Sequence, residues 1–131
     1  MKFRKMMGVT AAFLCAALAL SGCGSTDETA YRIGIVQQDE HSSLDAATQG
    51  FEDKLMELLG EENVTFDYQN AQGEQANCTT IATKFVSDGC DLILANGTTA
   101  LQSAAAATAD IPIVGTSVTD YIVAGAVNSN E

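Results

Sequence analysis

The sequence predicts an α/β fold with a parallel, doubly wound sheet of the flavodoxin-like strand order 2-1-3-4. From residue 31 onward, short apolar runs alternate with stretches of helical periodicity, separated by brief polar loops. The run at residues 92–95 is continuously apolar, as in a parallel strand covered on both faces, whereas residues 64–68 alternate, as in a strand at a sheet edge. Placing the alternating strand at the edge gives the predicted order.

The first 22 residues are predicted to be a secretory signal peptide rather than part of the fold. Basic residues (Lys2, Arg4 and Lys5) precede an apolar run over residues 9–20. This run is too short to span a bilayer and has the flanks of a signal sequence.

The apolar run ends in Leu20-Ser21-Gly22-Cys23, which resembles a bacterial lipoprotein signal. In that family the cysteine is lipidated and the chain is cut just before it. We therefore expect lipidation at Cys23, a polar tether over residues 23–30, and a folded domain over residues 31–131. The alternative is an ordinary signal peptide with an incidental cysteine.

The predicted mature chain is strongly acidic. Without residues 1–22 it carries 3 Lys and Arg against 17 Asp and Glu, a formal charge of −14. Such a domain should repel nucleic acids and anionic lipid surfaces. We therefore expect no nucleic-acid partner, and membrane contact through the lipid alone.

Residues 32–37 (RIGIVQ) are predicted to form the first strand. Ser42 can cap the helix that follows, with Asp45 as a weak capping box. Gly60 stops this helix, and its apolar residues recur at three- and four-residue steps, so one face should lie on the sheet. These residues are Leu44, Ala47, Phe51, Leu55, Leu58 and Leu59.

Residues 64–68 are predicted to form the second, edge strand, and residues 70–73 a loop. A second helix then runs to Asp88-Gly89. Cys78 and Cys90 would sit near its opposite ends, roughly 18 Å apart at the helical rise, which is too far for a disulfide. We expect both to be buried free thiols.

The third strand, at residues 92–95, leads into the turn Asn96-Gly97, and Thr98 can cap a helix over residues 100–107. The small residues of that helix would allow close approach to a sheet or a partner, although helix propensity explains them equally well. The fourth strand is expected at residues 110–114, with Pro112 tolerated near its start.

In a parallel sheet, the loops at residues 37–41, 70–73, 96–99 and 116–120 would meet at the carboxyl edge, where ligands bind in open α/β folds. Hydroxyls and backbone N–H groups there suit a carboxylate, and Asp120 or Glu40 could meet an ammonium, so a small zwitterion would fit. The alternative is that these residues are ordinary caps, turns and solvated loop positions. The candidate ligand-binding residues are Gln37, Glu40, His41, Asn96, Thr98, Thr99, Thr116, Ser117, Thr119 and Asp120.

Signals for catalysis and cofactors are weak. His41 is the only histidine and has no Cys/His cluster around it, which disfavours a zinc site. Ser117 does not lie in a GxSxG elbow, and no GxxxxGK motif occurs. Asp39 and Asp120 could pair for acid/base work, but charged loop residues are usually just solvated. We expect neither an enzyme nor a cofactor.

Several motifs in residues 31–127 are found together in one family. They are Ile33-Gly-Ile-Val-Gln-Gln, Glu40-His41, Leu44-Asp-Ala-Ala, Gly50-Phe51, Val64-Thr-Phe-Asp-Tyr-Gln-Asn-Ala-Gln-Gly, Ile81-Ala82, Lys84-Phe-Val, Asp91-Leu-Ile-Leu-Ala, Asp110-Ile-Pro-Ile-Val and Val118-Thr-Asp. With these motifs the chain resembles the first lobe of an ABC transporter substrate-binding lipoprotein of the tryptophan or aromatic amino-acid type. The stretch at residues 64–73 is the most specific.

The resemblance implies the first lobe of a type I periplasmic-binding-protein-like fold, in which two lobes close on a ligand and present it to a permease. We therefore expect an extracytoplasmic solute-binding component of an ABC importer, lipid-anchored to the bacterial cell membrane, with an amino acid as ligand and ABC permease subunits as partners. The second lobe is expected to be missing, and Tyr121 stands where the family usually has proline. The alternatives are a ligand-sensing lipoprotein domain without a transporter and, more weakly, an enzyme of flavodoxin-like fold.

Overall fold

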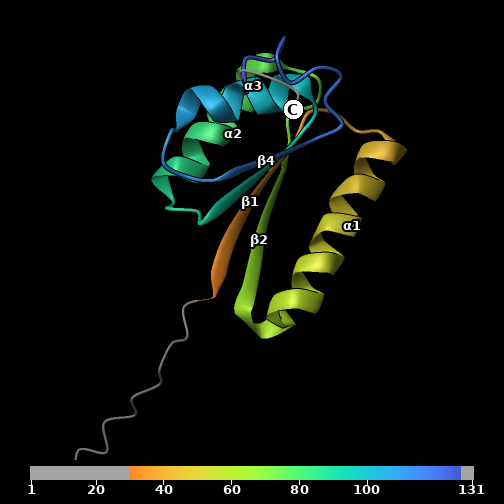
Figure 1. Ribbon diagram of the computed structural model, residues 1–131, viewed down its shortest axis with the longest axis vertical. Helices are drawn as coiled ribbons and strands as arrows, with labels where there is room; N and C mark the ends of the chain where they lie inside the picture. Colours follow the sequence, from red (N-terminus) through yellow and green to blue (C-terminus); the bar gives the residue numbers. More distant parts are fainter. Residues whose placement is uncertain (1–29, 128–131) are drawn as a thin grey trace, which may run out of the picture.

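A four-stranded parallel sheet of order β2-β1-β3-β4 forms the centre of the protein, as predicted (Figure 1). The computed structural model describes residues 30–127, so the predicted signal peptide and Cys23 lie outside it. The strands are β1 (Tyr31–Gln37), β2 (Val64–Asn70), β3 (Leu92–Asn96) and β4 (Ile113–Thr116), and the helices are α1 (Ser42–Leu59), α2 (Gln75–Ser87) and α3 (Thr98–Ala107), with a short 3-10 turn η1 (Glu61–Asn63) before β2.

Helices cover both faces of the sheet, with α1 on one side and α2 and α3 on the other (Figure 1). Side chains alternate along each central strand, so Ile33 and Ile35 of β1 pack beneath α1, while Val36 packs on the opposite side. The same alternation divides β3, where Leu94 faces α1 and Ile93 faces the other helices. Burial on both faces explains why these strands are continuously apolar in sequence.

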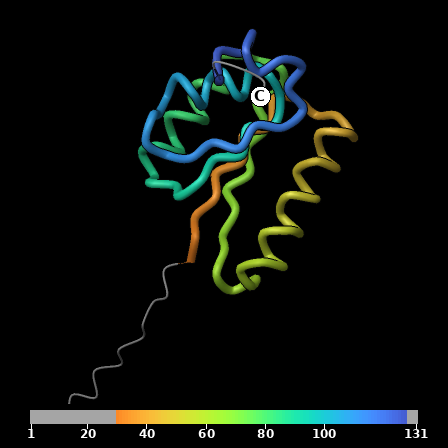
Figure 2. The backbone as a smooth tube through the Cα atoms, viewed as in Figure 1, coloured from red at the N-terminus to blue at the C-terminus, as the bar shows by residue number. Residues whose placement is uncertain are grey.

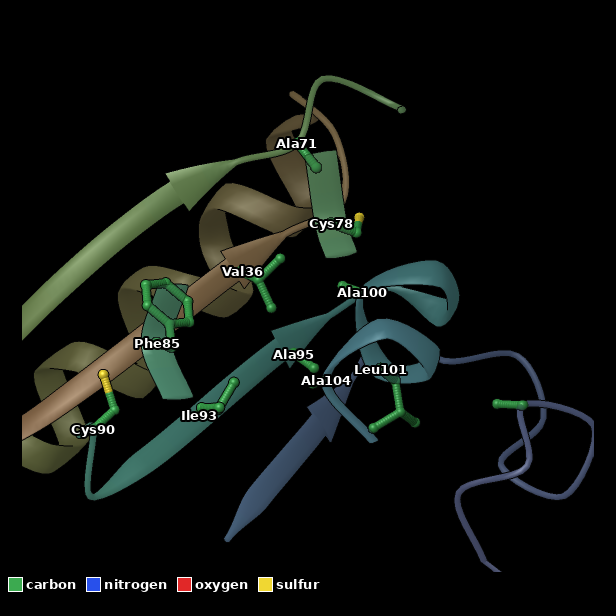
Figure 3. Packing of buried hydrophobic residues seen from close by; sticks show 11 residues of the cluster. Val36, Ala71, Cys78, Phe85, Cys90, Ile93, Ala95, Ala100, Leu101 and Ala104 are labelled. Carbon is green, nitrogen blue, oxygen red and sulfur yellow. The ribbon is translucent and has the colours of Figure 1, made fainter. Parts of the chain in front are cut away.

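The larger core cluster lies between the sheet and the helix pair α2 and α3 (Figure 3). Phe85 of α2 is fully buried and lies against β1 at Gly34, where a Cβ atom would come within 2.6 Å of the ring. Glycine at this position therefore lets α2 pack close to the sheet.

The small residues of α3 serve two purposes. Ala100 and Ala104 are fully buried where α3 packs on α2 and β3, so there they permit close packing. Ala105 and Ala106 are exposed, so the high helix propensity of alanine explains their presence.

Two predicted helix caps are wrong. Helix α1 is capped by His41 rather than Ser42: His41 has extended backbone angles, and its Nδ1 accepts a hydrogen bond from the Ser43 amide at 3.2 Å. At α3 the N-cap is Gly97, and Thr98 is already the first helical residue. In both cases the residue one position earlier has the non-helical backbone that a cap requires.

The fourth strand begins later than predicted, at Ile113 instead of residue 110. The hydroxyl of Thr108 accepts hydrogen bonds from the amides of Asp110 and Ile111, which holds this segment in a turn. Pro112 has no N–H to donate, and only its carbonyl joins the sheet, accepting from the Ile93 amide at 3.0 Å. Pairing with β3 then runs from Ile113 to Thr116.

Cys78 and Cys90 are both buried and free, as predicted. Cys90 lies beyond the end of α2 rather than within it, and its amide donates to the Phe85 carbonyl. Burial raises the pKa of both thiols, which keeps them in the less reactive protonated form. None of the helices within residues 30–127 combines the length and apolarity needed to cross a membrane.

A charged network ties α2 to the amino edge of the sheet. Lys84 of α2 forms salt bridges with Asp67 of β2 and with Asp88, and the Arg32 guanidinium donates to the Asp88 carbonyl at 2.7 Å. Hydrogen bonds from Lys84 and Gln69 lower the pKa of Asp67. The network therefore joins α2 to both β1 and β2.

Replacing Lys84 with methionine should destabilise the fold in a pH-dependent way. Because the folded pKa of Asp67 is lowered, its contribution is fully present above the ordinary aspartate pKa of 3.8 and is lost as the pH falls through the folded value. We expect the difference in urea midpoint between wild type and Lys84→Met to be measurable at neutral pH and to shrink well below pH 3.8. As a control, Lys54→Met breaks the exposed pair with Glu57 within α1. A Lys84→Met difference that stays constant with pH would contradict this account.

Candidate functional site

Four loops meet at the carboxyl edge of the sheet, at the upper end of the molecule in Figures 1 and 2. We call residues 37–41, 70–73, 96–99 and 116–120 the rim. Backbone hydrogen bonds join these loops in series: Gly73 N donates to Gln38 O at 2.8 Å, Gln38 N to Asn96 O at 2.9 Å, and Gly97 N to Thr116 O at 2.9 Å. The structure thus brings together the segments that carry all ten candidate residues.

Two of the candidate residues, Gln37 and Asn96, are fully buried at the base of the rim. They are paired in the β1–β3 register and point to the α1 side of the sheet. Thr48 of α1 donates to Gln37 Oε1 at 2.8 Å, and Asn96 Nδ2 donates to Thr48 Oγ1 at 3.0 Å and to Leu44 O at 2.8 Å. These contacts hold the first turns of α1 on the sheet.

Gln37 also fixes the loop after β1. Its Nε2 donates to Asp39 O at 2.9 Å and to Asp45 Oδ1 at 2.7 Å. The Asp45 carboxylate is therefore engaged with the sheet and not with a capping box at its own helix. The neighbouring Asn96 Oδ1 is buried without a hydrogen-bond partner within residues 30–127, because the Leu44 carbonyl, which can only accept, turns the Asn96 amide nitrogen toward itself.

The first turn of α3 receives its cap from another loop. Gly97 has no side chain and a φ of 118°, and Gln38 Oε1 accepts a hydrogen bond from the Thr99 amide at 2.9 Å. A Cβ atom on Gly97 would lie 2.6 Å from Gln38 Cβ. Glycine is thus required both by the backbone conformation and by the close approach of Gln38. Thr98 and Thr99 are partly exposed beside this contact.

The loop after β4 is shaped by its own side chains. Ser117 adopts a φ of 56° and is exposed, as is Thr119, while Thr116 is half-buried at the end of the strand. Asp120 Oδ1 accepts from the amides of Ile122 at 2.9 Å and Val123 at 3.1 Å, and so caps the turn that follows.

Glu40 and His41 are exposed in the loop after β1. The Glu40 amide donates to Asp39 Oδ1 at 2.8 Å. His41 Nδ1 lies 2.6 Å from Ser43 Oγ in addition to its capping bond, so one ring nitrogen is occupied by the start of α1. Both Glu40 and His41 are exposed, so they are accessible at the rim.

The exposed part of the rim offers hydroxyls, amides and carboxylates, which suits binding of a small polar molecule. Within the described part of the chain, no three His, Cys, Asp or Glu residues are grouped so that they could hold a metal ion. Sequence reasoning missed Gln38, and it missed the role of Thr48. The position of Thr48 on the inner face of α1, four residues after Leu44, was the available signal for it.

The chain is similar in sequence to a family of known proteins. Residues 32–131 match the family of ABC transporter substrate-binding proteins. The chain is 39% identical over 146 residues to a tyrosine-binding protein of Clostridioides difficile strain R20291, in an alignment that covers 99% of this chain and 42% of the relative. The chain therefore spans about two fifths of the length of this curated relative.

Solved structures agree with the match. A ligand-free, open substrate-binding protein with adhesive properties from Clostridium difficile superposes with a TM-score of 0.73 at 44% identity, over 76% of this chain and 34% of its own. A conserved domain protein from Vibrio cholerae has a TM-score of 0.74 at 37% identity, over 77% and 35%.

A third structure contains a bound amino acid. It is an ABC domain from Streptococcus pneumonia in complex with L-Trp, with a TM-score of 0.73 at 33% identity, over 77% of this chain and 35% of that one. Members of this family are typically binding proteins and not enzymes. On the fold, the strand order and these matches, the chain belongs to the ABC transporter substrate-binding protein family.

Proposed function

We propose that residues 31–131 form the N-terminal lobe of an extracytoplasmic solute-binding protein of an ABC importer, and that the rim is one wall of its binding site for an aromatic amino acid. The convergence of four loops at one sheet edge carries this proposal, because they bring hydroxyl and carboxylate side chains to a single exposed surface. ABC permease subunits would be the partners. The similarity to a tyrosine-binding protein and to a protein in complex with L-Trp supports an aromatic ligand.

The charges of the rim fit an amino acid. The three Lys and Arg residues within residues 30–127 lie elsewhere: Arg32 and Lys84 at the amino edge and Lys54 far along α1. A ligand carboxylate would therefore be held by neutral donors, for which the Thr98 and Thr99 side chains at the start of α3 are placed. Asp120 or Glu40 would supply the charge for the ammonium.

The ten candidate residues divide into two roles in this proposal. Gln37 and Asn96 are too deeply buried to touch a ligand in this conformation, and they would act by fixing α1 and the loop after β1. The eight others line the exposed rim and would make the contacts: Glu40, His41, Thr98, Thr99, Thr116, Ser117, Thr119 and Asp120.

We further propose that residues 1–22 are a signal peptide and that Cys23 carries the lipid which holds the protein on the outer face of the cell membrane. The support is the sequence pattern of a basic start, an apolar run and Leu-Ser-Gly-Cys. Two or more acyl chains give stable membrane association, whereas one gives only reversible binding.

The ligand assignment is tested by titrating the ¹⁵N-labelled protein with L-tyrosine and L-tryptophan, because NMR shifts also detect weak binding. We expect shifts at rim amides. Asp120→Asn keeps the oxygen that caps the following turn but removes the charge, and should weaken binding about tenfold, as for a charged hydrogen bond. Thr98→Val removes only a hydroxyl and should cost about fivefold.

The matched control is Asp110→Asn, which changes the net charge equally at an exposed position outside the rim, and which should bind like wild type. Wild-type affinity in both rim variants would show that the rim is not the site. A wild-type spectrum that does not respond to either amino acid would refute an aromatic amino-acid ligand.

The anchor is tested by fractionating bacteria that express the chain with Cys23→Ala. Without the thiol no lipid can be attached, so we expect the protein to move from the membrane fraction to the soluble or secreted fraction. Cys15→Ala, which alters only the predicted signal peptide, is the control and should remain at the membrane. Membrane retention of Cys23→Ala would contradict the lipoprotein assignment.

A further inference from the structure

Gln38 is not among the ten candidate ligand residues, yet it joins several segments of the rim. Gln38 is hydrogen-bonded to three segments besides its own: its amide donates to Asn96 O at the end of β3, its carbonyl accepts from Gly73 N after β2, and its side-chain Oε1 accepts from Thr99 N in α3. The loops after β1, β2 and β3 are thus joined through a single residue.

The side-chain bond has a specific physical origin. The first amides of a helix have no partner within the helix, and a Ser, Thr, Asp or Asn at the N-cap usually satisfies one of them. The N-cap of α3 is Gly97, which has no side chain. Gln38, which lies in the neighbouring loop after β1, accepts the hydrogen bond from the Thr99 amide instead.

The same glycine makes room for Gln38. Any other residue at position 97 would place a Cβ atom 2.6 Å from Gln38 Cβ, so a conventional cap and the Gln38 bond are mutually exclusive. The pair Gly97 and Gln38 therefore fixes the distance between the loop that carries Glu40 and His41 and the helix turn that carries Thr98 and Thr99.

We propose that Gln38 is a positioning residue of the binding rim: its side-chain bond to the Thr99 amide sets the spacing between the loops after β1 and β3. The expected effect of Gln38 on ligand binding rests on the proposed function. The spacing of the two loops by Gln38 does not depend on it. It also implies that the Thr99 amide is already satisfied, so that the ligand would meet Thr98 and Thr99 through their side chains.

The test uses Gln38→Met, which keeps the length of the side chain and both backbone bonds but removes the acceptor. Hydrogen exchange of the Thr99 amide, measured by NMR, should become about tenfold faster, as expected for the loss of one hydrogen bond. Gln38→Glu retains an acceptor oxygen and should restore the protection. Unchanged exchange in Gln38→Met would overturn the proposal.

Ligand affinity supplies the second readout. In the same titration, Gln38→Met should bind L-tyrosine roughly fivefold more weakly, because a loosened rim has to be ordered on binding. The control for simple destabilisation is Ala105→Gly, at an exposed site in α3 where glycine weakens the helix without touching Gln38. Equal losses in both variants, or wild-type affinity in Gln38→Met, would overturn the positioning role.

The two proposals fail separately. If the wild-type protein does not respond to L-tyrosine or L-tryptophan, the proposed function is wrong, and the exchange measurement alone then decides whether Gln38 fixes the rim. If the wild type binds and Gln38→Met shows both normal exchange and normal affinity, the proposed function stands and the role of Gln38 is wrong.

Discussion

The close contact between the loops after β1 and β3 is the constraint on which the rest of the rim depends. Gln38 approaches Gly97 so closely that no side chain fits between them, and it satisfies the backbone of α3 in place of a local cap. The hydrogen bond from Gly97 N to Thr116 O then holds the loop after β4 in place beside the loop after β3. A glycine with positive φ at one position thereby determines where three exposed loops lie relative to one another.

The two ends of the sheet are stabilised by different chemistry. At the amino edge, Arg32, Lys84, Asp67 and Asp88 form a charged network that holds α2 on the sheet. Beneath the carboxyl edge, the buried amides of Gln37 and Asn96 and the hydroxyl of Thr48 are hydrogen-bonded to one another, and Gln37 also donates to the Asp45 carboxylate. This division leaves the Lys and Arg side chains away from the rim, so the rim is suited to bind a carboxylate through dipoles and hydroxyls and an ammonium through its carboxylates.

Sequence patterns were enough for the topology but not for the caps. The continuous apolar run of β3 indicates a strand covered on both faces, and the alternating apolar and polar residues of β2 indicate a strand at the sheet edge. These two patterns were enough to predict the strand order. The cap of α3 could not be found in the same way, because Gln38 is distant in sequence and becomes a neighbour of Thr99 only when the sheet forms. Gln37 is buried because it lies on the same face of β1 as Ile33 and Ile35, and this two-residue spacing was visible in the sequence.

The central claim is that the carboxyl edge of this sheet is one wall of an amino-acid site. A crystal structure of the protein with L-tyrosine or L-tryptophan tests it most directly. The account predicts that the ligand carboxylate lies at the first turn of α3, beside Thr98 and Thr99, with its ammonium near Asp120 or Glu40. A ligand bound at the amino edge, beside the Lys84 network, or against the outer face of α1 would contradict it.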